Sequence, residues 1–246
     1  MDPADQIRID RIEAFAQKCE QPRGSDFAAE HAECVFVVGS KPAIAGEYVR
    51  NIRTKMAAQG RDPQDVLGFA YMKVITGGSE AEARAKYDEY SAQISYEGAL
   101  ALMSGWSGVD FSQYDPDQPI EYVETNAVRT LLHSFTSADP SRKWTMRDIA
   151  SYVGIGGAGP VLVGAPEQIA DKLEEWVAAG VDGFNLAYSI MPGSFEDFID
   201  GVVPVLQQRG RMQTAYGEGT LREKLFPHRG ARMRAPHPAA TCRQPW

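Results

Sequence analysis

Hydrophobic residues follow two alternating patterns along the chain. Short apolar runs are typical of strands in a parallel sheet, because such strands are covered on both faces. Apolar residues that recur every three or four positions are typical of amphipathic helices. The predicted strands are 34–38, 66–75, 181–186 and a shorter fourth at 161–163, and the predicted helices are 4–20, 25–32, 43–59, 80–103, 166–179 and a final helix reaching Leu206. Strands that alternate with helices predict an α/β fold with a parallel sheet.

Several helix boundaries have recognisable signals. Ser79 and Glu82 have the spacing of a capping box, which predicts the start of the long helix 80–103. Gly60 is expected to end the helix 43–59, because glycine readily adopts the left-handed conformation that follows many helices.

The last two helices carry further signals. Pro166 suits the first turn of its helix. The predicted apolar face of that helix is Ile169, Leu173, Trp176 and Val177. In the final helix, Ser194 and Asp197 are expected to be caps, and Pro204 is expected to introduce a kink.

Three segments depart from this rhythm. Residues 1–24 are interpreted as a divergent N-terminal helix and turn. Residues 104–150 have broken periodicity and are interpreted as a helical or irregular insertion within the sheet-forming region 25–226. The tail 227–246 is rich in proline, alanine and arginine and is expected to be disordered.

Composition narrows the classes of function. The 246 residues carry a formal net charge of −8, which argues against nucleic acid or an anionic membrane as the partner. No apolar run approaches the ~20 residues of a membrane span, and the N-terminus lacks the apolar segment of a secretory signal. The 3 cysteines and 4 histidines show no metal-ligand spacing. We therefore expect reduced thiols, a cytoplasmic location and no metal site.

A glycine-rich run at 154–159 matches the pattern G-x-G-x-x-G. A dinucleotide site needs this run after a strand and before a helix. Here a helix-like stretch, residues 146–153, precedes the run, and the predicted strand 161–163 follows it. A flexible hinge is therefore the favoured interpretation.

Two places could bind a ligand. Residues 21–25 (QPRGS) lead into a helix, so a phosphate could use the first helical N–H groups and Arg23. An ordinary loop with a solvated arginine is the alternative. Asn185 and Tyr188 lie at and just beyond the last strand, where parallel α/β enzymes gather their site residues. Met191 follows in the same loop, and a structural role for these three residues is also open.

Four aromatic residues lie in or near the insertion. They are Phe111, Trp106, Tyr114 and Trp144. They could line an apolar pocket, although packing is the more common role of such residues. The sequence contains no recognisable catalytic constellation, and the catalytic residues are not identified.

Several segments together are similar to one enzyme family. They are VGAPEQIADKLEEWVAAGVDGFNL, MPGSFEDFIDGVVPVLQQRG and TLREKL near the end, and PRGSDFAAEHAECVFV and SEAEARAKYDEY upstream. Over about residues 21–226 the chain resembles flavin-dependent monooxygenases of the bacterial luciferase-like superfamily. The most similar branch is that of the nitrilotriacetate and dibenzothiophene-sulfone monooxygenases.

The resemblance implies a TIM barrel that uses reduced FMN, supplied by a separate flavin reductase, and O₂ to oxygenate a small organic or xenobiotic substrate. It covers only the last strands of that barrel, so a partial TIM (β/α) barrel is expected. Gln21 matches the serine expected to meet the FMN phosphate, and Cys19 matches a glycine. Arg23 and Gly24 match the adjoining turn and are expected to lie near the phosphate.

A second hypothesis is a non-catalytic barrel fragment with weak or no flavin binding. A partial barrel exposes strand edges and an apolar face, which favours self-association and a homo-oligomer. Flavin binding by the chain separates the two hypotheses.

Overall fold

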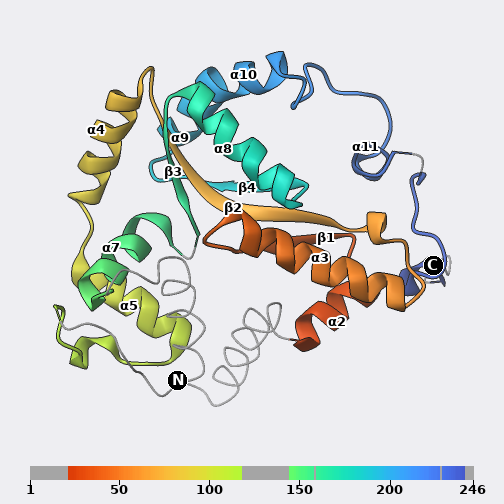
Figure 1. Cartoon of the computed structure of the whole chain (residues 1–246), viewed down its shortest axis with the longest axis horizontal. Coiled ribbons are helices and arrows are strands. Elements are labelled where there is room, and N and C mark those ends of the chain that lie inside the picture. Colours follow the sequence, from red (N-terminus) through yellow and green to blue (C-terminus); the bar gives the residue numbers. More distant parts are fainter. Residues whose placement is uncertain (1–21, 118–143, 158, 228, 242–246) are drawn as a thin grey trace, which may run out of the picture.

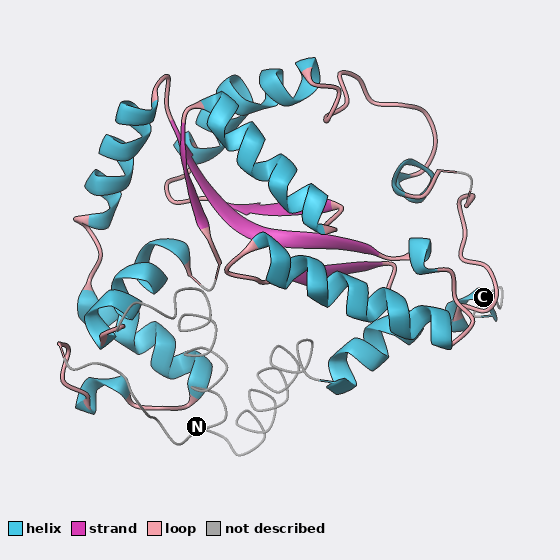
Figure 2. Cartoon of the chain, viewed as in Figure 1, coloured by secondary structure: helices cyan, strands magenta, loops and turns pink. Residues whose placement is uncertain are grey.

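The computed structural model describes residues 22–117, 144–157, 159–227 and 229–241. Within these ranges four parallel strands form one open sheet, and α3 and α8 lie across the same face of it (Figures 1 and 2). The strands are β1 (Cys34–Val37), β2 (Leu67–Thr76), β3 (Val161–Gly164) and β4 (Gly183–Ala187). The predicted parallel α/β architecture is confirmed.

Nine α-helices lie in the described ranges. They are α2 (Pro22–His31), α3 (Pro42–Ala58), α4 (Glu80–Ser91), α5 (Tyr96–Ser107), α7 (Met146–Gly156), α8 (Pro166–Ala179), α9 (Gly193–Asp197), α10 (Val203–Gln208) and α11 (Leu221–Leu225). Short 3₁₀ turns occupy Pro63–Asp65, Phe111–Gln113 and Pro238–Thr241, and a π-helical turn occupies Phe198–Val202.

β2 is the central strand, and the other three strands all pair with it. The backbone N–H groups of Leu67 and Lys73 donate to the residues just before β1 and β3, whereas the C=O of Gly68 accepts from the residue just before β4. Because successive residues of a strand direct their backbone polar groups to opposite sides, β1 and β3 share one edge of β2 and β4 lies along the other. In a complete barrel each strand pairs with its sequence neighbours. Here β4 pairs with β2 and not with β3.

The main core lies between the sheet and the helices α3 and α8. Alternate residues of β2 point toward these helices, and three of the four residues predicted for the apolar face of α8 are buried. The buried contacts include Ala70, Met72 and Val74 of β2 and Ile169, Leu173 and Trp176 of α8. Full burial of each large apolar side chain contributes about 1.5–3 kcal/mol. The prediction is wrong for Val177, whose side chain is exposed because it lies beyond the edge of the contact stripe.

Two helix boundaries near the N-terminal side can be compared with prediction. The stop after α3 is confirmed, because Gly60 adopts a positive φ of 76°. Helix α2 begins at Pro22, three residues before the predicted start at residue 25, so Arg23 and Gly24 lie in a helical first turn. The predicted helix 4–20 lies outside the described residues.

The predicted long helix 80–103 is two helices, α4 and α5. Ser79 accepts a hydrogen bond from the N–H of Glu82 and caps α4 as predicted. The chain then breaks, and the hydroxyl of Ser95 accepts from the N–H of Gly98 at 3.0 Å. Ser95 therefore starts a new helix, since a side-chain cap replaces the missing intrahelical acceptor.

α5, α7 and the turn Phe111–Gln113 build a second, smaller core. Its buried residues are Ala99, Leu100, Met103, Phe111, Met146, Ile149, Ala150 and Val153. Phe111 is fully buried in it and Trp144 packs against it, so packing accounts for these two aromatic residues. The described ends of the predicted insertion 104–150 are thus packed, and residues 118–143 lie outside the described part.

The final helix contains a π-helical turn between α9 and α10, immediately before Pro204. Proline cannot donate a backbone hydrogen bond, so a local change of helical pitch next to it is expected. The prediction that Ser194 and Asp197 cap this helix is wrong. The hydroxyl of Ser194 instead accepts from the N–H groups of Ser189 and Ile190, both at 3.0 Å, and fixes the preceding loop.

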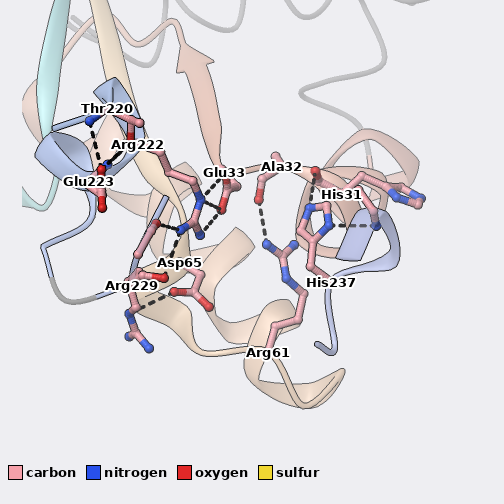
Figure 3. Close-up of polar contacts among 12 residues, drawn as sticks. His31, Ala32, Glu33, Arg61, Asp65, Thr220, Arg222, Glu223, Arg229 and His237 are labelled. Atoms are coloured by element: carbon pink, nitrogen blue, oxygen red, sulfur yellow. Dashed lines mark hydrogen bonds and ion pairs between the residues drawn. The ribbon is translucent and has the colours of Figure 1, made fainter. Parts of the chain in front are cut away.

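The C-terminal tail differs from the expected disorder over residues 229–241. Arg229 forms ion pairs with Asp62 and Asp65, and the buried ring of His237 contacts the backbone oxygen of His31 at 3.0 Å (Figure 3). The composition of the tail cannot build an apolar core, but Arg229 meets two acidic residues just before β2. Ion pairs therefore hold a segment that lacks hydrophobic periodicity.

Arg222 of α11 anchors the start of this tail. Its guanidinium contacts the carboxylate of Glu33 at 2.6 Å, and both side chains are 16% exposed. The same guanidinium donates to the backbone oxygens of Arg229 and Gly230 (Figure 3). Glu33 immediately precedes β1, so this cluster lies at the amino end of the strands. In barrel enzymes that end serves stability and not chemistry.

Candidate functional site

Hydrogen bonds tie the carboxyl ends of β2 and β3 to each other, and link the end of β2 through α4 to α9, the helix that follows β4. The hydroxyl of Thr76 donates to the backbone oxygen of Gly164 at 2.9 Å. Lys86 of α4 donates to the backbone oxygen of Thr76 at 3.1 Å and pairs with Asp197 of α9 at 2.8 Å. Burial is the largest single effect on Lys86 and opposes its charge, but the hydrogen bond to Asp197 together with the charges of Asp197 and Glu82 raises the pKa of Lys86 overall. This network fixes the rim from which the candidate residues project.

The loop after β4 carries two of the predicted site residues on its surface. Tyr188 is 50% exposed, and its ring packs edge-on against Phe195 with centroids 5.9 Å apart. Met191 is 60% exposed. Because Ser194 fixes the backbone of this loop, an aromatic and a thioether side chain are presented to solvent in a defined place.

Asn185 lies on β4 itself, in register with Tyr71 of β2. Its side chain is exposed on the sheet face opposite α3 and α8. That face would form the interior of a barrel, since barrel helices pack on the outside.

The sequence analysis missed two polar residues of β2 on this same face, Tyr71 and Lys73. Burial raises the pKa of the Tyr71 phenol and lowers the pKa of the Lys73 ammonium. Lys73 donates to the backbone oxygen of Ile155 at 2.6 Å. Their two-residue spacing within an apolar strand was a usable signal, because such residues share a face.

Gly157 and Gly159 of the glycine-rich run pack against this face, beside Tyr71. A Cβ at Gly159 would lie 2.2 Å from the ring of Tyr71, and one at Gly154 would lie 2.3 Å from the side chain of Ile94. The glycines therefore allow the backbone to approach neighbouring side chains. The rejection of a dinucleotide site agrees with the observed order, in which the run begins in the last turn of α7 and leads into β3.

The predicted phosphate residues lie in the first turn of α2. Arg23 is exposed, and no acidic residue occupies this first turn. Ser25, which follows Gly24, is buried and accepts a hydrogen bond from Lys55 of α3. Gln21 lies outside the described residues.

The structure does not join the two groups of candidate residues. In the described ranges no hydrogen bond, ion pair or ring contact links Arg23 or Gly24 to Asn185, Tyr188 or Met191. Helix α2 packs on α3 beside β1, whereas the loop after β4 lies on the other edge of β2 (Figure 1). A single ligand that touched both groups would have to cross the interior face of the sheet.

Comparison with known proteins decides the family. The model of the family described as "Luciferase-like monooxygenase" matches residues 18–183. The chain belongs to this family. The family assignment made from the sequence is confirmed, and the open sheet agrees with the expected partial barrel.

Named luciferase-like relatives are about twice as long as this chain. Dimethyl-sulfide monooxygenase of Hyphomicrobium sulfonivorans is 46% identical over 90% of the chain and 46% of its own length. Long-chain alkane monooxygenase of Geobacillus thermodenitrificans is 36% identical over 90% of the chain and 46% of its own length. The chain thus spans about half the length of the curated relatives it matches.

A solved luciferase-like structure has the same arrangement. The crystal structure of DmoA from Hyphomicrobium sulfonivorans matches with a TM-score of 0.81 and 46% identity, over 89% of this chain and 47% of that one. Half of a family barrel therefore accounts for almost all of this chain.

Among the described residues, no helix combines the length and apolar character that a membrane crossing requires.

Proposed function

We propose that this chain supplies half of a monooxygenase site that uses reduced FMN and O₂ to oxygenate a small organic substrate. The observation that carries the proposal is the 46% identity with a named monooxygenase along 90% of the chain. Bound flavin would supply the oxygen chemistry, and the protein would bind, orient and shield it. A separate flavin reductase would supply the reduced cofactor, and we place the protein in the cytoplasm.

The first turn of α2 fits the phosphate of FMN. The N-terminal N–H groups of a helix have no intrahelical partner and carry partial positive charge. Here Arg23 is exposed beside them and no carboxylate in the first turn opposes an anion. Backbone N–H groups at Gly24 and the guanidinium of Arg23 would hold the phosphate, with the amide of Gln21 as a further donor.

The residues at and after the end of β4 would hold the flavin ring and the substrate. Tyr188 and Met191 would cover an apolar ligand and exclude water, and the amide of Asn185 would orient its polar atoms. Each of these side chains is exposed on this chain alone. A closed pocket would therefore need further walls beyond these three residues.

The relatives suggest which substrate to test first. The relative at 46% identity is named for dimethyl sulfide, and another, at 33% identity, is named for dibenzothiophene sulfone. We therefore propose a small organosulfur compound, tested with dimethyl sulfide, a flavin reductase and product detection.

Quenching of flavin fluorescence on titration with FMN tests the proposal directly. The wild-type chain should bind one FMN, and Arg23→Gln should weaken binding about tenfold because it removes a charged hydrogen bond to the phosphate. Arg211→Gln, which changes an exposed arginine elsewhere, should leave the affinity unchanged. Absence of binding at high micromolar FMN would reject the proposal for this chain.

A non-catalytic, self-associating fragment is the second candidate. The observation that favours it is Phe36 on β1, which is 68% exposed on the interior face of the sheet. The hydrodynamic mass of the chain tests this candidate separately from flavin binding.

A further inference from the structure

The interior face of the sheet carries a compact group of hydrogen-bond donors. In register, Tyr71 of β2 lies beside Asn185 of β4, and Lys73 lies beside Ala187. Paired residues of parallel strands share a face, neighbouring strands are about 4.8 Å apart, and alternate residues of one strand are about 7 Å apart. The side chains of Tyr71, Lys73 and Asn185 therefore start from one small patch.

Lys73 brings an uncompensated charge to this patch. Its ammonium donates one hydrogen bond to the backbone oxygen of Ile155. Within the described ranges, no carboxylate lies at ion-pair distance from it. Lys86 offers a contrast, because its partner Asp197 raises the pKa of Lys86, whereas burial alone lowers that of Lys73. A half-buried cation without a counter-charge is costly, and a bound anion would offset that cost.

The other two members offer neutral donors. In the described part of the chain, neither the Tyr71 hydroxyl nor the Asn185 amide has a hydrogen-bond partner. The backbone at Gly159 abuts the Tyr71 ring, and a Cβ at Gly157 would lie 3.5 Å from its hydroxyl. This packing holds the ring in place and leaves the hydroxyl available to a ligand.

We propose that Lys73, Tyr71 and Asn185 form a binding site for the oxyanion group of a small ligand, a sulfonate or carboxylate. The ammonium neutralises the charge, and the hydroxyl and amide donate to its oxygens. The site is distinct from the phosphate position at α2, which lies beside β1. It shares Asn185 with the proposed substrate pocket but goes beyond the proposed monooxygenase function, and its test uses no flavin.

Methanesulfonate is the probe, and dimethyl sulfone is its neutral analogue of similar shape. Both are titrated at constant ionic strength into the full, isotope-labelled chain, and the side-chain NMR signals of Lys73 are followed. Methanesulfonate should give a saturable shift and raise the pKa of Lys73, because the bound anion favours the charged ammonium. Dimethyl sulfone should bind at least about tenfold more weakly, because a charged hydrogen bond is lost.

Substitutions test whether methanesulfonate binds at these three residues. Binding to each variant is followed through the backbone amide NMR signals of β2. Lys73→Met should weaken methanesulfonate binding by about tenfold or more, Tyr71→Phe and Asn185→Ala by several-fold, and Lys73→Arg should retain it. Lys172→Met is the matched control, since Lys172 also donates to a backbone carbonyl, that of Val163 at 2.7 Å, but from α8. It should bind like the wild type.

Three results would overturn the proposal. They are no saturable shift up to about 100 mM methanesulfonate, equal binding of the sulfone, and equal binding by a folded Lys73→Met chain. Lys73→Arg keeps the test decisive if the methionine variant fails to fold, because it should fold and still bind.

Discussion

Gly159 shows how closely single residues are constrained around the sheet. An added Cβ would lie 2.2 Å from the Tyr71 ring, whereas at Gly105 in α5 nothing lies within 4 Å. We expect Gly159→Ala to lower the free energy of unfolding by about 1–3 kcal/mol through overpacking. Gly105→Ala should raise it by up to about 1 kcal/mol, because alanine favours a helix. Urea denaturation measures both, and a shift of the same sign in the two variants would contradict this account.

Arg222 is a second residue whose contacts should contribute measurably to the free energy of unfolding. It pairs with Glu33 across 189 positions of sequence and also bonds to the backbone of the tail. Arg222→Met should reduce the free energy of unfolding by about 2 kcal/mol, because it leaves a largely buried carboxylate without its partner. The control Arg211→Met removes an arginine that is 59% exposed, and it should change stability by less than about 0.5 kcal/mol. If Arg211→Met lowered the free energy of unfolding as much as Arg222→Met, the buried ion pair would not be the cause of the loss.

Helices and strands could be predicted from the sequence wherever the spacing of apolar residues determines their type and position. All four strands, and the helices α3 and α8, follow from apolar spacing, and the candidates Asn185 and Tyr188 follow from their position after a strand. The break at Ser95 was missed because the apolar spacing runs across it, and only a side-chain hydrogen bond ends the element. Tyr71 and Lys73 were missed because the strand was interpreted as apolar on both faces, although their two-residue spacing places them on one face.

The tail was not predictable from its own composition, because its partners are distant in sequence. Arg229 meets Asp62 across 167 positions. No local sequence pattern predicts an ion pair between residues so far apart in the chain. Long-range ion pairs and the exposure of interior-facing side chains are therefore the parts of the fold that single-sequence patterns leave undecided.

The packed tail element should respond to acid. The Gln64 N–H and the guanidinium of Arg229 hold the pKa of Asp62 below its usual value. A carboxyl with a lowered folded-state pKa adds stability above its unfolded pKa, near 3.9, and loses it as the pH falls through the folded value. We expect Asp62→Asn to remove part of the stability loss below about pH 4. Urea denaturation from pH 6 to pH 3 measures this, and equal slopes for the two chains would exclude a role for Asp62.

At the scale of the whole molecule, the sheet is complete on its helical side and open on its interior side. α3 and α8 bury alternate residues of β2, whereas Phe36 and Cys34 of β1 remain exposed. Within the described residues β1 pairs only with β2, so its outer edge has free backbone groups. Exposed apolar rings beside an unpaired strand edge favour association.

This arrangement predicts that the chain associates with itself through β1. Phe36 is 68% exposed, and its ring lies 6.1 Å from that of Phe69, so the two form a continuous apolar surface. Sedimentation velocity at about 100 µM should give a mass above the 27.0 kDa of one chain, because unpaired edges associate in this concentration range. Phe36→Lys should shift the population to the monomer, since a lysine beside a free edge opposes pairing. Leu221→Lys, which alters an equally exposed apolar residue on α11, should leave the mass unchanged. A monomeric wild-type chain, or an equal effect of both substitutions, would show that β1 is not the associating edge.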